Sequence, residues 1–212
     1  MTPLISFLIP TLRERQKKFK SLTDKLFLQI EENNLQNEIE IISIYDNRTI
    51  PLSKKRNMMQ KMCSGMYFLH LDDDDRVADD YCITCVTEIK KLIEDKEPIM
   101  PDVIGYDQMC EVDDRFFIVK CSGQSGMGLS HTGMFAENIP IYTRIPWQYC
   151  LWKREKFSSV YRTDVDTNAR EDMNWLKKAF LEYPQGFHNI DKILHYYYFK
   201  TNGTGEDATT CQ

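Results

Sequence analysis

Apolar residues gather in three short runs along the first half of the chain. Residues 4–10, 38–46 and 66–72 are rich in Ile, Leu, Phe and Tyr, and each has the length of a β-strand. The first run is apolar at nearly every position, which is typical of a parallel strand that is buried on both faces. We therefore predict three strands here.

Amphipathic stretches separate these predicted strands. Residues 14–34 repeat apolar side chains every three or four positions, which predicts a helix with one buried face. Residues 53–65 predict a shorter helix, with Ser53 as its N-terminal cap and Gly65 as its stop. The order strand–helix–strand–helix–strand is that of a parallel sheet covered by helices.

A third helix follows the last of these strands, over residues 79–94, with Asp79 or Asp80 as its cap. Cys82 and Cys85 lie on its apolar stripe. A structural zinc site would need two more ligands at matching spacing, and no second such pair occurs in the sequence. Core packing is therefore the preferred interpretation of the two cysteines.

The second half of the chain has a different character. Residues 102–112 and 115–122 flank an Asp-Asp pair and predict an antiparallel hairpin. Residues 122–134 are glycine-rich without a phosphate-loop motif, so they predict either a mobile loop at an active site or an ordinary surface loop. A helix is expected at 170–183, with Met173, Leu176, Ala179 and Phe180 on its buried face, then a strand at 189–200 and a flexible tail at 201–212.

These elements define an α/β fold. We expect one domain with an open, mostly parallel sheet, helices on both faces and a smaller antiparallel part in the C-terminal half. No internal repeat or linker divides the chain. In such sheets ligands bind beyond the carboxyl ends of the strands.

Composition and charge exclude several classes of function. The 212 residues are 42% hydrophobic, so the chain can bury a core, and a net charge of −5 disfavours nucleic acid as a partner. No apolar stretch approaches the length of a membrane span. Seven scattered cysteines, an odd number, predict reduced thiols and a soluble protein of the cytoplasm.

Four consecutive aspartates, Asp72 to Asp75, end the third predicted strand. If the segment is extended, Asp72 and Asp74 point the same way and repel each other. A divalent cation would reverse that interaction, and carboxylate oxygens suit hard ions such as magnesium or manganese. The alternative is a solvated acidic loop that also caps the next helix. Metal binding is the preferred hypothesis.

Five ordered motifs carry a family resemblance: "ISFLIPTLRER", "EIISIYDN", "KKRNMM", "YFLHLDDDD" and a late "RED". Together, over about residues 4–183, they resemble a family 2 glycosyltransferase of the GT-A fold, and more narrowly the glycosyltransferase domain of a large algal-virus protein, whose location would be the host cytoplasm. The resemblance implies one domain over 1–200, with a nucleotide-binding half at 1–100 and an acceptor half at 101–200.

The resemblance also implies a reaction and its partners. The enzyme would be metal-dependent, inverting and non-processive, and would move a sugar from a nucleotide-sugar, a UDP-sugar being favoured, to a hydroxyl of a glycan or glycoprotein. Manganese is the favoured cofactor and magnesium is the alternative. The Gln-x-x-Arg-Trp motif of processive synthases is absent from the sequence.

Individual roles follow from the match. The residues placed on the nucleotide-sugar are Pro10, Thr11, Arg13, Asp46, Lys54, Arg56, Asp72 and Asp73. Asp74 would ligate the metal directly, and Asp72 would contact the ribose or metal-bound water. For the basic residues, a solvated helix face is almost as good an interpretation. Asn47 stands where the family more often has a second aspartate, so the nucleotide contacts are less certain in this chain.

The late Glu-Asp pair would supply the catalytic base. Asp172, beside Glu171, would take the proton of the acceptor hydroxyl. The alternative is that both acids only favour the positive end of a helix dipole. His195 either approaches the metal from the last strand or packs in an aromatic core, and we prefer the core.

Two other classes of protein compete with this interpretation. A sugar nucleotidyltransferase usually carries a glycine-rich, lysine-containing signature after its first strand, where this chain reads "TLRERQKK". A non-enzymatic metal-binding module could use the acidic loop alone, but the calcium-binding EF-hand pattern is not met.

Overall fold

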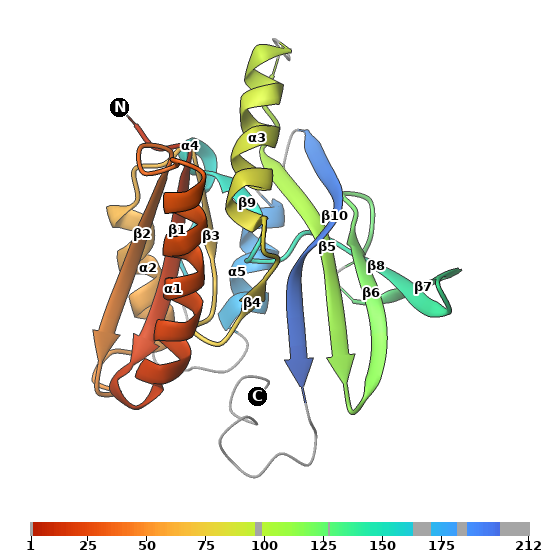
Figure 1. Ribbon diagram of the computed structural model, residues 1–212, viewed down its shortest axis with the longest axis horizontal. Helices are drawn as coiled ribbons and strands as arrows, with labels where there is room; N and C mark the ends of the chain where they lie inside the picture. Colours follow the sequence, from red (N-terminus) through yellow and green to blue (C-terminus); the bar gives the residue numbers. More distant parts are fainter. Residues whose placement is uncertain (1, 96–98, 127, 163–170, 182–185, 200–212) are drawn as a thin grey trace.

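The computed structural model describes residues 2–95, 99–126, 128–162, 171–181 and 186–199 (Figure 1). The predicted tail at 201–212 lies outside the described residues. The strands are β1 (Ile5–Leu12), β2 (Ile39–Asp46), β3 (Tyr67–His70), β4 (Arg76–Val77), β5 (Val103–Val112), β6 (Arg115–Cys121), β7 (Ser130–Ala136), β8 (Ile139–Arg144), β9 (Leu151–Lys153) and β10 (Phe187–Phe199). The helices are η1 (Arg13–Arg15), α1 (Gln16–Glu32), α2 (Leu52–Met62), α3 (Tyr81–Glu94), α4 (Arg154–Phe157) and α5 (Glu171–Leu181).

A parallel layer forms the first half of the sheet, as predicted. β1 pairs in parallel with β2 on one side and with β3 on the other. Seven of the eight residues of β1 are buried, which explains its continuous apolar sequence. α1 and α3 pack beside each other on one face of the sheet, and α2 lies on the other face (Figure 1).

An antiparallel part extends the sheet. β9 joins β3 to β5, and the β5–β6 hairpin turns at Asp113 and Asp114, whose φ angles of 49° and 61° suit a tight hairpin turn. β10 runs parallel to β5 along the edge opposite β6, and its far end also pairs with β4 (Figure 1). The hairpin and the final strand are confirmed.

The glycine-rich segment 122–134 is only partly a loop. Its last residues belong to β7, which pairs with β8 in an antiparallel ladder. The ladder is irregular between His131 and Phe135, where Gly133 has a φ of 76°. β7 is mostly exposed, so its sequence lacks the apolar alternation that would have predicted a strand.

The ends of two predicted helices differ from expectation. Ser53 does not cap α2: the helix begins after Pro51, and Ser53 is buried without a capping hydrogen bond. α2 also ends at Met62, before Gly65. Asp80 occupies the N-cap position of α3, but its carboxylate bonds to Thr84 Oγ1 rather than to a backbone amide of the first turn.

The core contains the two cysteines that raised the question of zinc. Cys82 and Cys85 are fully buried on α3, which confirms core packing. The six cysteines among the described residues are all buried, free thiols. Within the part of the chain that the structure describes, none of the helices is both long and apolar enough to cross a lipid bilayer.

α5 buries a slightly different face from the predicted one. Trp175, Leu176 and Ala179 are buried, whereas Met173 is only half-buried. The side chain of Phe180 lies outside the described residues. Trp175, rather than Met173, lies on the buried face of the helix. Its ring packs against Phe68 and Trp152.

Gly65 serves close packing rather than helix termination. Its amide donates hydrogen bonds to Ser6 Oγ (2.8 Å) and Glu40 Oε1 (3.1 Å). A Cβ at this position would lie 2.6 Å from Ser6 Oγ and 2.8 Å from the backbone carbon of Ile5.

We predict that Gly65→Ala lowers the free energy of unfolding by about 1–3 kcal/mol, because β1 must shift to admit the methyl group. Gly126→Ala is the control, since a Cβ there meets no atom within 4 Å. Urea unfolding measures both variants. If both variants have the same free energy of unfolding, β1 can shift to admit the methyl group without loss of stability.

Candidate functional site

The carboxyl ends of β1, β2 and β3 meet at one edge of the sheet. Leu12, next to Thr11, is in register with Asp46 at the end of β2. Thr11 Oγ1 donates a hydrogen bond of 2.7 Å to Asp73 Oδ2, which links β1 to the acidic run after β3. Three of the motifs that the sequence predicted for a donor site are therefore neighbours in space.

The four aspartates form a tight turn rather than an extended segment. The Asp75 amide donates to the Asp72 carbonyl (3.0 Å), and the Asp72 amide donates to Asp75 Oδ2 (2.7 Å). The side chains of Asp72 and Asp74 are 36% and 27% exposed, whereas that of Asp73 is 4% exposed. The expected extended geometry is wrong, but Asp72 and Asp74 are the more open pair.

Arg15 neutralises the middle of this turn. Its guanidinium contacts Asp73 Oδ1 through Nη2 (2.6 Å) and Asp74 Oδ2 through Nη2 (2.8 Å), and Lys18 lies 3.5 Å from Asp74. Asp73 is thus held between Arg15 and Thr11, so its carboxylate faces the protein. Arg13, which the sequence placed on the donor, is exposed two residues away.

Lys55 neutralises Asp46 at the end of β2, as Arg15 neutralises the acidic turn. It forms a buried ion pair with Asp46, and its Nζ donates to the Thr11 carbonyl (2.8 Å). Burial by itself would raise the pKa of Asp46, but the Lys55 ammonium and the Ile50 amide, which donates at 2.7 Å, hold that pKa below its usual value. Lys54, the predicted donor contact, is exposed.

Pattern reasoning therefore missed Lys55 and Arg15 by one or two positions. A helix places each successive residue about 100° further around its axis, so neighbouring cations face different directions. The sequence showed that each short segment is basic, but it did not show which of its basic residues would face the carboxylates. Pro10, also predicted at the donor site, is buried within β1.

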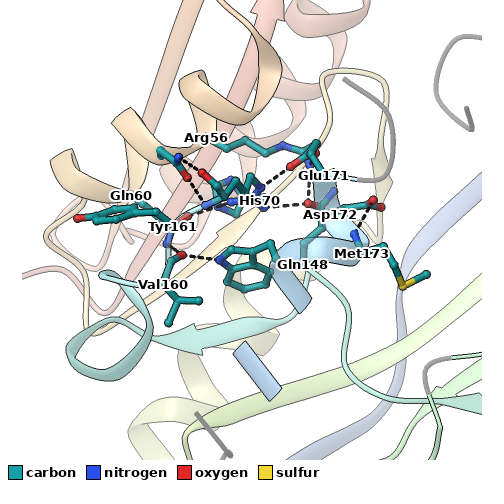
Figure 2. Close-up of polar contacts among 12 residues, drawn as sticks. Arg56, Gln60, His70, Gln148, Val160, Tyr161, Glu171, Asp172 and Met173 are labelled. Carbon is teal, nitrogen blue, oxygen red and sulfur yellow. Dashed lines mark hydrogen bonds and ion pairs between the residues drawn. The ribbon is translucent and has the colours of Figure 1, made fainter. Parts of the chain in front are cut away.

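Arg56 joins the acidic turn to α5. It is almost fully buried, and its guanidinium pairs with Asp72 through Nη2 and with Glu171 through Nη1 (Figure 2). The Gln148 side-chain oxygen accepts a further hydrogen bond from Nη1. Residues from α2, the end of β3 and α5, far apart in the sequence, thus share one cation.

Arg162 is the second buried guanidinium of this site. Its Nε pairs with Glu171 Oε2, while Nη1 donates to Gln60 Oε1 (2.9 Å) and Nη2 to Gln148 Oε1 (3.2 Å). Burial lowers the pKa of Arg162 to about 10, with Glu171 opposing the shift, so the side chain stays charged at neutral pH. Sequence reasoning missed Arg162, because no motif marks it.

His70 is buried beneath these two arginines. Burial and the positive charges of Arg162 and Arg56 hold its pKa well below the usual value, so the imidazole is neutral. His70 packs edge-on against Trp175.

The two members of the Glu-Asp pair have different surroundings. Glu171 is buried, and each of its oxygens pairs with a different arginine. Asp172 is half-buried, and its Oδ1 accepts a hydrogen bond of 2.7 Å from the Met173 amide (Figure 2). Of the two, Asp172 is the more exposed residue.

His195 borders the acidic turn from β10. It stacks on Tyr149, with centroids 4.5 Å apart and rings 6° from parallel, which confirms its aromatic packing. Its Nε2 lies 3.3 Å from Asp75 Oδ1, and its Nδ1 lies 2.8 Å from Gln108 Nε2. The ring therefore supports one wall of the turn.

The acidic turn can be tested for its fit to a divalent cation. Among the described residues, no three His, Cys, Asp or Glu side chains converge in a ready-made metal site. Asp72 and Asp74 nevertheless offer two partly exposed carboxylates, which is the protein's share when phosphates and water supply the remaining ligands of a hard ion. A hard ion at this turn would therefore need further ligands from phosphates or water.

Comparisons with known proteins define the fold. The sequence matches no protein-family profile and no curated protein. The structure is similar to that of S. aureus TarS residues 1–349, with a TM-score of 0.55 and 17% identity over 92% of this chain. The likeness shows that this chain has the GT-A-type fold that its motifs predicted.

Two related crystal structures of TarS 1–349 hold ligands. The complex with UDP-GlcNAc matches with a TM-score of 0.55 and 16% identity over 98% of this chain, and the complex with UDP with a TM-score of 0.52. This chain covers 61% of TarS 1–349 in the UDP-GlcNAc complex and 36% of the longer TarS chain.

The contacts of Arg15 generate a stability prediction. Arg15→Gln should lower the free energy of unfolding by about 1–3 kcal/mol, because the buried Asp73 carboxylate keeps only Thr11 as a side-chain partner. Arg13→Gln, at an exposed position, should change it by less than about 0.5 kcal/mol. Denaturant unfolding of the two variants measures the difference, and equal values would mean that Asp73 is satisfied without Arg15.

Proposed function

We propose that this chain is a metal-dependent, inverting and non-processive glycosyltransferase, which transfers a sugar from a UDP-sugar to a hydroxyl group of a glycan or glycoprotein. The observation that carries this proposal is the position of Arg56. Its guanidinium contacts Asp72 in the acidic turn and Glu171, the neighbour of Asp172. A candidate donor site and a candidate base are thus two ends of one buried network.

The TarS structures support the choice of donor. TarS is a family 2-like glycosyltransferase, and its crystal structures contain UDP-GlcNAc and UDP. In this chain the carboxyl edge of the parallel strands carries Thr11, Asp46 and the acidic turn. The nucleotide would lie along the ends of β1 and β2, with Asp46 near the base and Asp72 near the ribose.

Charge explains how the acidic turn would handle a diphosphate. Asp72 and Asp74 would hold a manganese or magnesium ion, which when bound neutralises charge on the leaving nucleotide. Arg15 and Lys18 already face Asp74, so positive charge also borders the site from α1 and η1. These cations can contact phosphate oxygens directly.

The surroundings of Glu171 and Asp172 support a different role for each. Both oxygens of Glu171 are occupied by arginines, so Glu171 orients and does not accept the substrate's proton. Asp172 would take the proton from the acceptor hydroxyl as the oxygen attacks the anomeric carbon, on the side opposite the diphosphate. A single displacement of this kind inverts the anomeric configuration.

Donor binding should depend on the metal. UDP should raise the melting temperature more with manganese present than with EDTA, because a ligand that binds the folded state stabilises it more when it binds more tightly. Asp74→Asn should remove the manganese-dependent part of the shift. Asp79→Asn is the control, because the Asp79 side chain is 99% exposed and lies outside the turn. Equal UDP shifts in manganese and EDTA would exclude a metal-bridged donor.

Asp172→Asn separates catalysis from binding. Asparagine keeps the size and the acceptor for the Met173 amide but loses the base, so transfer should fall by about 10²–10⁴-fold while UDP affinity is retained. Glu171→Gln should instead destabilise the fold by about 3–5 kcal/mol, because two buried arginines lose their shared anion. Turnover assays and thermal unfolding distinguish the two. Near-normal turnover by Asp172→Asn, or retention of configuration in the product, would disprove the assigned base.

A further inference from the structure

Arg162 contacts α5 at two points, one helical turn apart. Its Nε pairs with Glu171, the first residue of the helix, and its guanidinium carbon lies 4.9 Å from the centre of the Trp175 ring. Trp175 also donates a hydrogen bond of 2.7 Å from Nε1 to the Val160 carbonyl, two residues before Arg162. Residues 160–162 therefore hold the start of α5 by a salt bridge, a cation–π contact and a hydrogen bond.

The contacts of Arg162 with α5 also determine the direction in which the Asp172 side chain points, because of the geometry of the helix. Glu171 and Trp175 are four residues apart, so they lie on the same face of α5. Asp172 lies about 100° further around the axis and leaves that face. Any rotation of the helix would move the Asp172 carboxylate sideways. Holding Glu171 and Trp175 together therefore sets the direction in which Asp172 points.

Arg162 and Arg56 differ in their contacts with the acidic turn. Arg56 contacts Asp72, so changing it would disturb the acidic turn as well as α5. The hydrogen-bonding and ionic partners of the Arg162 guanidinium that the structure describes are Glu171, Gln60, Gln148 and the neutral His70, and none of them belongs to the acidic turn. Arg162 thus contacts Glu171 directly, whereas it is connected to the acidic turn only indirectly, through Glu171 and Gln148, which Arg56 also contacts.

The chemistry of this position favours arginine over lysine. The planar guanidinium stacks on Trp175 and at the same time directs three nitrogens at Glu171, Gln60 and Gln148. An ammonium group keeps the charge but cannot stack or fork in this way. A lysine would neutralise Glu171 while leaving the first turn of α5 free to rotate.

We propose that Arg162 is a positioning residue, which fixes the rotation of α5 so that the Asp172 carboxylate lies in line with the attacking hydroxyl. This inference rests on the proposed transferase function. A displacement of about 1 Å can cost about 10²-fold in rate, so a loosened helix should slow the transfer step and spare nucleotide binding.

The test compares Arg162→Lys with Arg56→Lys and the parent enzyme. UDP affinity with manganese is measured by calorimetry, and kcat and KM are measured with the UDP-sugar that the parent uses. Arg162→Lys should lower kcat by about 10–100-fold and leave UDP affinity within about twofold of the parent. Arg56→Lys should weaken both. Ile30→Val, a core truncation on α1 outside the site, controls for general loss of stability and should keep the parent's kcat.

Two further measurements keep the outcome decisive. Hydrogen exchange should quicken in the first turn of α5 in Arg162→Lys but not in Ile30→Val. If Arg162→Lys does not fold, Trp175→Phe replaces it, because phenylalanine keeps an aromatic ring but loses the hydrogen bond to Val160. It should show a smaller fall in kcat at unchanged UDP affinity.

The contrary results are distinct. Loss of UDP affinity in proportion to kcat, or unchanged kcat with faster exchange, would mean that Arg162 only stabilises the fold. A parent protein that neither binds UDP nor transfers sugar would overturn the proposed function itself, and the positioning role with it. If hydrogen exchange in α5 is unchanged in Arg162→Lys, Arg162 does not fix the rotation of the helix, whatever the activity of the variant.

Discussion

The carboxylate of Glu171, held between two buried guanidinium groups, is the interaction on which the candidate site depends. Arg56 and Arg162 come from different parts of the chain and would repel each other without an anion between them. Asp72 provides the second negative charge, so two cations face two anions. Buried ions are tolerated only when their hydrogen bonds are nearly complete, and Gln60 and Gln148 supply further acceptors here. The same condition makes the arrangement specific, because α2, the end of β3 and α5 must all be in place to satisfy it.

The acidic turn follows the same principle closer to the surface. Four adjacent carboxylates are held in a tight turn because each has a partner outside the run: Asp72 pairs with Arg56, Asp73 and Asp74 share Arg15, and Asp75 approaches His195. Asp72 and Asp74 nevertheless keep part of their surface open. Along this short run, the buried Asp73 is paired inside the protein, whereas Asp72 and Asp74 are paired and also partly exposed.

The two networks meet at Arg56. Occupation of the acidic turn would act directly on a guanidinium that also holds Glu171, and Glu171 begins the helix that carries Asp172. The acidic turn and the first residue of α5 are therefore connected through a single buried side chain. Arg162, stacked on Trp175, holds the other oxygen of Glu171 and would keep the helix steady while the donor side changes.

The sequence by itself determined the parallel strands β1, β2 and β3, the helices between them, the β5–β6 hairpin and the order of the motifs, because burial periodicity and turn chemistry are local properties of the chain. It placed the acidic run at an expected ligand edge, and the family resemblance gave the Glu-Asp pair its expected role as the base. Only the tertiary structure decided that Lys55 and Arg15, rather than Lys54 and Arg13, face the carboxylates, that Asp73 is buried, and that Glu171 is enclosed by arginines. The strands β7 and β8 and the part played by Arg162 were also decided there. The physical reason is that these features depend on contacts between residues up to 115 positions apart, and a charge pattern does not record which partner each charge will meet.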